Sequence, residues 1–266
     1  MGVIIGNIVA IFRKELQSYF ASPFAYLVAA IFWLLSGFFF VAILIGPGGI
    51  IDQVALVDQQ GGTPQPIDVA YEFLRFFLNV MGSMTLFLLP ILSMGLYAEE
   101  RKRGTIELLA TSPLTNWSVA VGKLLGVLTF FTFMIVPILV YEAIALSAAS
   151  PPVQPAVPLL AHAGLILLAA SVLSLGMFVS SLTDSTILAA FLTFSLNVFL
   201  WVIGEFSGNI SGIFGEVLGH VSLLKNYDTL VKGVLDPSSF VLFVSYIILG
   251  IFLTAQSIDA LRFGRS

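Results

Sequence analysis

Side chains that commonly perform catalysis are scarce in this sequence. It contains no cysteine and only two histidines, His162 and His220, so it offers no thiol nucleophile and no cysteine-based zinc site. Gly122-Lys123 is followed by leucine and lacks the upstream glycine of a phosphate-binding loop. The adjacent carboxylates Glu99-Glu100 lie in a charge run without an acid–base partner. The pattern therefore predicts no catalytic, cofactor-binding or metal-binding site, and the chain is not expected to be an enzyme.

The composition indicates which solvent surrounds the chain. Of its 266 residues, 58% are hydrophobic and 10% are charged, and the mean hydropathy is +1.04. An ordinary soluble domain has about 25% charged residues, which keep its surface hydrated. The 11 basic and 15 acidic side chains are too few to cover a water-soluble globule of this length. A soluble enzyme and a nucleic-acid-binding domain are therefore excluded, and the sequence predicts a membrane protein.

Several stretches are long enough and free enough of charge to cross a bilayer, which takes about 20 apolar residues as a helix. The uncharged region 143–183 is too long for one crossing and is divided by prolines at 151, 152, 155 and 158. Lipid-exposed backbone must satisfy its own hydrogen bonds, so the predicted fold is an all-α polytopic membrane protein. One transmembrane domain is expected over 1–266, with six spans at about 24–45, 76–97, 117–146, 159–180, 186–203 and 240–257.

The distribution of basic residues predicts the orientation. With six spans, both termini and the 2–3 and 4–5 connections share one side of the membrane. That side carries eight of the 11 basic residues, which by the positive-inside rule makes it cytoplasmic. We therefore expect a multi-pass protein of the cell (inner) membrane with both termini in the cytoplasm. The eight residues are Arg13, Lys14, Arg101, Lys102, Arg103, Lys123, Arg262 and Arg265.

The first 20 residues have the periodicity of an amphipathic helix. Apolar side chains recur at helical spacing from Ile4 to Tyr19, and Arg13 and Lys14 lie on the opposite face. Such a helix is predicted to lie in the headgroup plane before the chain turns into span 1 at Ser22-Pro23. A solvated leader is the alternative.

The connection between spans 2 and 3 is the densest polar segment. After the charge run 99–103, Gly104 interrupts the chain, and a short amphipathic helix is expected over 105–110 before Ser112-Pro113 stops it. A solvated loop with positive-inside charges explains the basic residues but not this apolar helix. A rigid element of this kind suits docking to a partner. The candidate contact residues are Arg13, Lys14, Glu99, Glu100, Arg103, Gly104, Thr105, Ile106, Glu107, Leu109, Ser112 and Pro113.

A glycine series and one intramembrane carboxylate are predicted toward the extracytoplasmic side of the membrane. Gly204, Gly208 and Gly212 begin a glycine series that would share one face of a continuous helix, where small residues allow close helix approach. This segment is predicted to form a pair of short helices re-entering the outer leaflet, with a flexible glycine-rich loop as the alternative. Glu142 is the intramembrane ionisable candidate. Its position near the outer boundary favours a structural or boundary role over a functional one.

The sequence resembles the type-2 ABC transporter permeases. The residues that carry the resemblance are the segment from Glu99 to Pro113 followed by Gly122-Lys123, then 180–185 and 232–237. Within that family it is most similar to the gliding-motility-type permeases. The resemblance implies a membrane subunit that pairs with a second permease copy or paralogue and sits on two copies of a separate ATPase, which binds ATP and Mg²⁺. The N-terminal helix and the 2–3 helix would be the coupling elements, and an extracytoplasmic accessory protein is a further expected partner.

The predicted function is that of a permease subunit of an ATP-driven exporter. Glu99, Glu100 and Arg103 would orient the docked helix through charge pairs, while Ile106 and Leu109 would fill a groove of the ATPase. The glycines from 204 to 212 would lie at the dimer interface or outer gate, and membrane lipids surround the spans. One alternative is a mechanical transmitter or anchor that passes ATPase-driven motion to an outer complex. An intramembrane enzyme is disfavoured, because paired catalytic residues are lacking.

Overall fold

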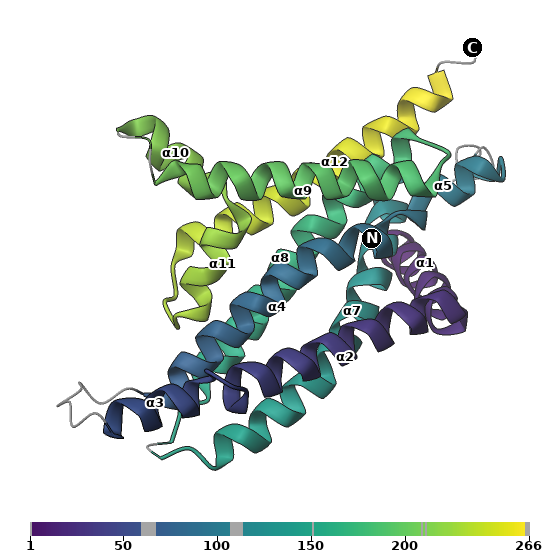
Figure 1. The fold of residues 1–266 in the computed structure, drawn as a ribbon. Coiled ribbons are helices and arrows are strands. Elements are labelled where there is room, and N and C mark those ends of the chain that lie inside the picture. Colours follow the sequence, from purple (N-terminus) through teal and green to yellow (C-terminus); the bar gives the residue numbers. More distant parts are fainter. Residues whose placement is uncertain are drawn as a thin grey trace.

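Helices are the only regular elements in the described part of the protein. The computed structural model describes residues 2–59, 68–106, 114–150, 152–208, 210 and 212–263, and every element within these ranges is an α-helix. In Figure 1, α1 (Gly2–Ala21), α5 (Gly95–Lys102) and the end of α12 (Pro237–Phe263) lie toward the right, while α3 (Ile50–Gln59), α10 (Ile213–Val221) and α11 (Leu223–Val231) lie toward the left. The long helices run between these two ends. The predicted all-α architecture is confirmed.

Six segments of the described residues are long and apolar enough to cross a membrane. Each coincides with a predicted span, so the expected number of spans is confirmed. Thr115 begins the third of these helices by accepting a hydrogen bond from the Ser118 amide at 3.3 Å, which satisfies a free donor of the first turn. The corresponding helices are α2 (Pro23–Ile45), α4 (Val69–Ser93), α7 (Asn116–Ser147), α8 (Ala156–Leu182), α9 (Thr186–Ser207) and α12 (Pro237–Phe263).

The second span is longer than the sequence predicts. Its helix begins at Val69, breaks at Met94 and continues as α5 (Gly95–Lys102), beyond both ends of the expected 76–97. The extra turns contain charged residues such as Glu72 and Arg101. A test for uncharged residues locates the part that fits in hydrocarbon, whereas the helix itself continues into polar surroundings.

A single residue joins the N-terminal helix to the first span. The helix α1 (Gly2–Ala21) ends directly before Ser22, and α2 starts with Pro23. The Ser22 hydroxyl oxygen accepts a hydrogen bond from the Ala25 amide at 3.3 Å, and proline is well suited to a first helical position because it has no amide hydrogen to satisfy. The predicted turn at Ser22-Pro23 is confirmed.

Short helices occupy the end opposite α1. The predicted pair between spans 5 and 6 is present as α10 (Ile213–Val221) and α11 (Leu223–Val231). Between spans 1 and 2 lies α3 (Ile50–Gln59), a helix that the sequence analysis did not predict. This helix has only 10 residues and contains two acidic side chains, so its sequence lacks the long apolar stretch that indicates a membrane helix.

The helix α8 forms the centre of the bundle. It packs against α4, α7, α9, α11 and α12. Of the most apolar 18-residue stretch of α8, 78% is buried, compared with 17% for α9 and 22% for α2. Small residues permit this packing: a Cβ on Gly176 would lie 2.7 Å from the Ser93 Cβ, and one on Gly250 would lie 2.6 Å from the Ser174 backbone carbon. The exposed apolar faces of α2 and α9 are therefore the surfaces available to lipid or to another chain.

Candidate functional site

Two glycines hold the N-terminal helix close to the third span. The helix α1 packs along α7. A Cβ on Gly122 would lie 2.8 Å from the Cβ of Ile11, and a Cβ on Gly126 would lie 2.7 Å from the Cβ of Glu15. Side chains at these positions would force the helices apart, so the glycines set the distance between α1 and α7. This close approach brings Glu15 next to Lys123.

Lys123 is the centre of a buried polar cluster. The residue is 3% exposed, and its ammonium group donates to Glu15 Oε2 at 3.3 Å, to Glu100 Oε1 at 3.0 Å and to the Leu96 carbonyl at 2.8 Å. These bonds use all three donors of a lysine. The ammonium also lies 5.0 Å from the centroid of the Tyr97 ring, within cation–π range. We call these five residues the Lys123 cluster; they join α1, α5 and α7.

The charges of the Lys123 cluster depend on one another. Burying an ion costs several kcal/mol, which only close partners offset. Two carboxylates share the single ammonium of Lys123, with side chains 14% (Glu15) and 18% (Glu100) exposed. The second cation near Glu100 is Lys14 at 3.9 Å, whose side chain is 74% exposed, and exposed ion pairs contribute little. The packing of three elements therefore depends on Lys123.

Serines at the end of α8 hold α5 in place. The Ser180 hydroxyl oxygen accepts hydrogen bonds from the amides of Tyr97 and Ala98 at 3.1 and 3.0 Å. Both amides belong to the first turn of α5, where no intrahelical acceptor is available. Arg101 donates to the Ser181 carbonyl at 2.9 Å. The fourth span thereby fixes the direction in which α5 leaves the bundle.

Gly104 interrupts the chain, as predicted, and it does so as a left-handed residue after the end of α5. Its φ is +71°, and its amide donates to the Arg101 carbonyl at 3.1 Å, while the Thr105 amide donates to the Glu100 carbonyl at 2.9 Å. This pair of bonds is the Schellman arrangement, which satisfies carbonyls left free at a helix end. The chain therefore turns sharply at Gly104, one helical turn after Glu100, whose side chain belongs to the Lys123 cluster.

Replacing Gly104 with alanine is expected to destabilise this turn by about 1–2 kcal/mol, because a Cβ disfavours the left-handed conformation. Asparagine tolerates that conformation better, so Gly104→Asn is expected to retain most of the stability. Hydrogen–deuterium exchange at the amides of α5 measures the effect. Equal protection in the wild type and in Gly104→Ala would contradict the prediction.

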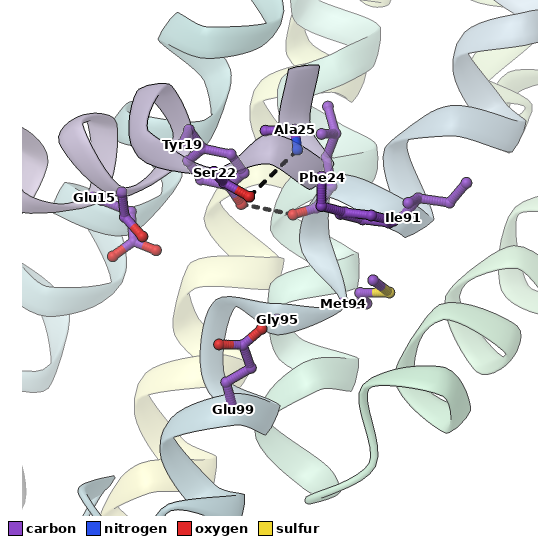
Figure 2. Close-up of a pocket in the computed structure, with 11 residues that line it drawn as sticks. Glu15, Tyr19, Ser22, Phe24, Ala25, Ile91, Met94, Gly95 and Glu99 are labelled. Carbon is purple, nitrogen blue, oxygen red and sulfur yellow. Dashed lines mark hydrogen bonds between the residues drawn. The ribbon is translucent and has the colours of Figure 1, made fainter. Parts of the chain in front are cut away.

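A pocket of about 130 Å³ lies between α1, α2, α4 and α5. Glu15 and Glu99 line it from two different helices, and Figure 2 shows the Tyr19 ring between α1 and the end of α4. The Tyr19 hydroxyl donates to the Leu92 carbonyl at 2.6 Å. Burial, and then the nearby carboxylates Glu15 and Glu99, raise the pKa of Tyr19 well above its usual value. Tyr19 therefore stays neutral and ties α1 to α4.

The predicted contact residues divide into exposed and internal groups. Glu99 and Arg103 form a surface ion pair at 3.3 Å. Glu100 instead turns inward to Lys123, so it stabilises this chain rather than standing free to orient a docked partner. Ile106 is 8% exposed and belongs to the apolar core, so it is already covered. Arg13, Lys14, Gly104 and Thr105 are exposed, whereas Glu107, Leu109, Ser112 and Pro113 lie outside the described residues.

The glycines after span 5 do not lie on one helix. Gly204 belongs to α9, Gly208 follows its last residue, and Gly212 precedes α10 with φ +85°. A Cβ on Gly204 would lie 2.5 Å from the Ser222 Cβ, whereas nothing lies within 4 Å of a Cβ on Gly208 or Gly212. Because the helix ends at 207 and resumes at 213, a shared small face cannot form. The proposed position at a dimer interface or outer gate stays a prediction.

Glu142 is more deeply buried than a boundary residue. It is 1% exposed, and its Oε2 lies 3.4 Å from Nε2 of His162, which is 3% exposed. The sequence favoured a structural or boundary role, and burial of Glu142 between two helices fits the structural one. Glu142 is not the single ionisable residue inside the spans, since Lys123 is buried within α7.

Lys123, Glu15 and Ser180 are the important residues that the sequence analysis did not select. Lys123 entered there as a positive-inside charge and as part of the Gly122-Lys123 pair that carries the resemblance, but not as a contact residue. A signal was present, because Gly122 and Gly126 flank this charge within an apolar helix, and glycines so placed indicate a neighbouring helix in close contact. Glu15 in the N-terminal helix carries the opposite charge and was an available partner for Lys123.

Six membrane-length helices among the described residues, with a buried polar cluster at one end, define a multi-pass membrane protein. Residues 9–265 match the family model described as ABC-2 family transporter protein. The chain therefore belongs to this family and is a permease subunit of an ABC transporter. A search of curated proteins found no match to the chain. Members of the family are membrane components that are generally not catalytic themselves, and membership implies an ABC ATPase as partner.

Proposed function

We propose that this chain is the membrane subunit of an ATP-driven exporter and that its ATPase docks on the end formed by α1 and α5. The observation that carries the proposal is the Lys123 cluster. It joins α1 and α5, which both reach this end, to α7, which runs to the opposite end of the bundle. A partner that displaces α1 or α5 therefore also displaces α7.

The exposed charges at this end support an ATPase contact. Arg13 and Lys14 of α1, with Lys102 and Arg103 at the end of α5, are exposed. Their sign supports assigning this end, with both termini, to the cytoplasmic side of the inner membrane, where ATP and Mg²⁺ would be bound by the ATPase. Basic side chains are complementary to an acidic rim on such a partner and would orient its approach.

The surfaces that this chain leaves open support a proposal for the arrangement of the whole transporter. We infer a second copy or a paralogue against the weakly buried helices α2 and α9, with two ATPase subunits beneath the pair. The open spaces at Gly208 and Gly212 leave the opposite end available to an extracytoplasmic accessory protein. A gliding-motility-type assembly is a finer assignment within this proposal.

Reversing two exposed charges tests the docking site. The double variant Arg13→Glu/Arg103→Glu is expected to weaken binding of the ATPase by about tenfold or more, because like charges then face each other across the contact. The matched control is Lys225→Glu, an exposed lysine at the opposite end. Co-purification of the ATPase and stimulation of its ATP hydrolysis by the permease provide the measurement. Unchanged binding in the double variant, or equal loss in the control, would contradict the assignment of this end.

Transport itself separates the exporter from a mechanical transmitter. The permease and the ATPase that co-purifies with it can be reconstituted in vesicles with lipid, glycan or peptide cargo. ATP-dependent movement of any of these across the bilayer supports export. ATP hydrolysis that remains coupled to the permease without movement of cargo would favour the transmitter.

A further inference from the structure

Glu142 and His162 form a second buried polar contact, distant from the Lys123 cluster. Glu142 lies in the last third of α7 and His162 in the first third of α8. They are 1% and 3% exposed, and Glu142 Oε2 lies 3.4 Å from His162 Nε2. Among the described residues, neither carboxylate oxygen of Glu142 nor Nε2 of His162 has a hydrogen-bond partner. The facing atoms of these two titratable groups therefore have no other polar partner among the described residues.

The backbone fixes the tautomer of the His162 ring. Its Nδ1 lies 2.9 Å from the carbonyl oxygen of Pro158. A carbonyl oxygen can only accept a hydrogen bond, so Nδ1 carries a hydrogen. When the imidazole is neutral, Nε2 therefore presents a lone pair toward Glu142.

This geometry requires a hydrogen between the two groups. An ionised carboxylate and an unprotonated Nε2 would both present lone pairs and would leave an uncompensated negative charge in the interior, which is costly. One proton, either on the Glu142 carboxyl or on Nε2, makes the contact attractive and its net charge zero. A second proton would leave a net positive charge instead. Burial therefore favours one proton on the pair.

The neighbouring titratable groups do not supply that hydrogen. Tyr141 and Tyr227 interact electrostatically with Glu142, but the Tyr141 hydroxyl donates to Ser36 Oγ at 3.0 Å and the Tyr227 hydroxyl to the Leu78 carbonyl at 2.9 Å. Burial, then Glu142 and then Asp228, raise the pKa of Tyr227 well above its usual value, so it stays neutral.

Other charges do not compensate for Glu142 either. Asp228, the charged residue beyond Tyr227, is paired with Lys232 of its own helix end. Within the described part of the chain, no lysine or arginine lies within 4.0 Å of the Glu142 carboxylate. A net charge on the Glu142–His162 pair would therefore have no counter-ion.

We propose that Glu142 and His162 together are a one-proton binding site that holds α7 against α8. The site keeps its proton through the neutral pH range, where an exposed histidine loses its own. Proton loss at high pH, or gain of a second proton at low pH, weakens the contact between the third span and the central helix. The proposal does not depend on the exporter function.

Counting the protons tests the proposal directly on the purified full-length protein in detergent. Nitrogen-15 labelling of histidine gives two rings to follow, and His220→Gln assigns the signal of His162. Infrared difference spectra between the wild type and Glu142→Gln report whether Glu142 is a carboxylic acid or a carboxylate. If Glu142→Gln does not fold, Glu142→Asp serves, because it shifts the frequency of the same carboxyl group.

The two spectra together give a proton number for the pair between pH 6 and 8. A protonated Glu142 with neutral His162, or an ionised Glu142 with an imidazolium, gives one proton and supports the proposal. An ionised Glu142 with neutral His162 gives none, and a protonated Glu142 with an imidazolium gives two. Either of these results would overturn it.

Thermal unfolding supplies an independent readout. The midpoint of the wild type is expected to fall as the pH rises from 7 to 9, because the unfolded chain has already lost the histidine proton that the folded pair must release. In the Glu142→Gln variant the introduced amide donates to Nε2 and does not titrate. At least half of the fall in the unfolding midpoint is therefore expected to disappear. His220→Gln, which alters an exposed histidine, is expected to keep the wild-type profile. A profile in Glu142→Gln equal to that of the wild type would count against the site.

Discussion

Replacing Lys123 with methionine is expected to lower the free energy of unfolding by about 3–5 kcal/mol, because removal of one partner leaves buried charges without compensation. The two carboxylates that share its ammonium, Glu15 and Glu100, would then face each other in a site that is mostly closed to water. We expect α1 to separate from α7 as a result. Reversible unfolding in mixed detergent micelles measures the loss, and protease sensitivity of α1 reports the separation.

Two variants distinguish a charge effect from a packing effect. The triple variant Lys123→Met/Glu15→Gln/Glu100→Gln removes all three charges and is expected to recover much of the stability, since an uncharged replacement of a buried ionic group is often neutral. Lys14→Met removes a lysine whose side chain is 74% exposed and is expected to cost less than about 1 kcal/mol. Equal losses in Lys123→Met and in the triple variant would contradict the role given to the charges.

Gly126→Leu is expected to force α1 away from α7 at the level of the Lys123 cluster. A Cβ at this position would lie 2.7 Å from the Glu15 Cβ, and overpacking of a closely packed interface costs about 1–3 kcal/mol. The displaced Glu15 would also lose its bond to Lys123, which adds to the cost. A spin-label or cross-link distance between α1 and α7 measures the displacement, and ATPase stimulation by the permease reports the functional loss.

The matched control for this substitution is Gly37→Leu in α2. Within this chain nothing lies within 4 Å of a Cβ at Gly37, so a larger side chain there leaves the contact between α1 and α7 unchanged. Leucine also favours a helix over glycine by almost 1 kcal/mol, and the control is therefore expected to be neutral or slightly stabilising. If Gly37→Leu reduced ATPase stimulation as much as Gly126→Leu, the contact between α1 and α7 would not be the cause.

The elements of this fold were predictable where their signals are local. Absence of charge located the six spans, and single residues such as Ser22 and Gly104 marked helix ends that the structure contains. Each of these signals depends on residues within a few positions of one another. Capping and left-handed glycine act over one turn of backbone, so the sequence alone carries them.

The polar contacts between helices were not predictable in the same way. Lys123 and Glu15 are separated by 108 positions, and no local pattern states that α1 lies on α7. The same applies to Glu142 and His162, which meet because α7 and α8 are antiparallel neighbours. Whether a charged residue such as Glu100 faces a partner protein or its own chain depends on the tertiary packing around it. Sequence therefore indicated which end is polar, but not which charges are used internally.

Ser22 has a mechanical consequence for the first span. It is the single non-helical residue between α1 and α2, and one residue contributes only two soft backbone dihedrals. The hydrogen bond from Ala25 further restrains them. A sideways push on α1 cannot be absorbed in a slack linker and must appear as a tilt of α2, whose outward face is largely open. Ser22 therefore couples the orientation of the N-terminal helix directly to the tilt of the first span.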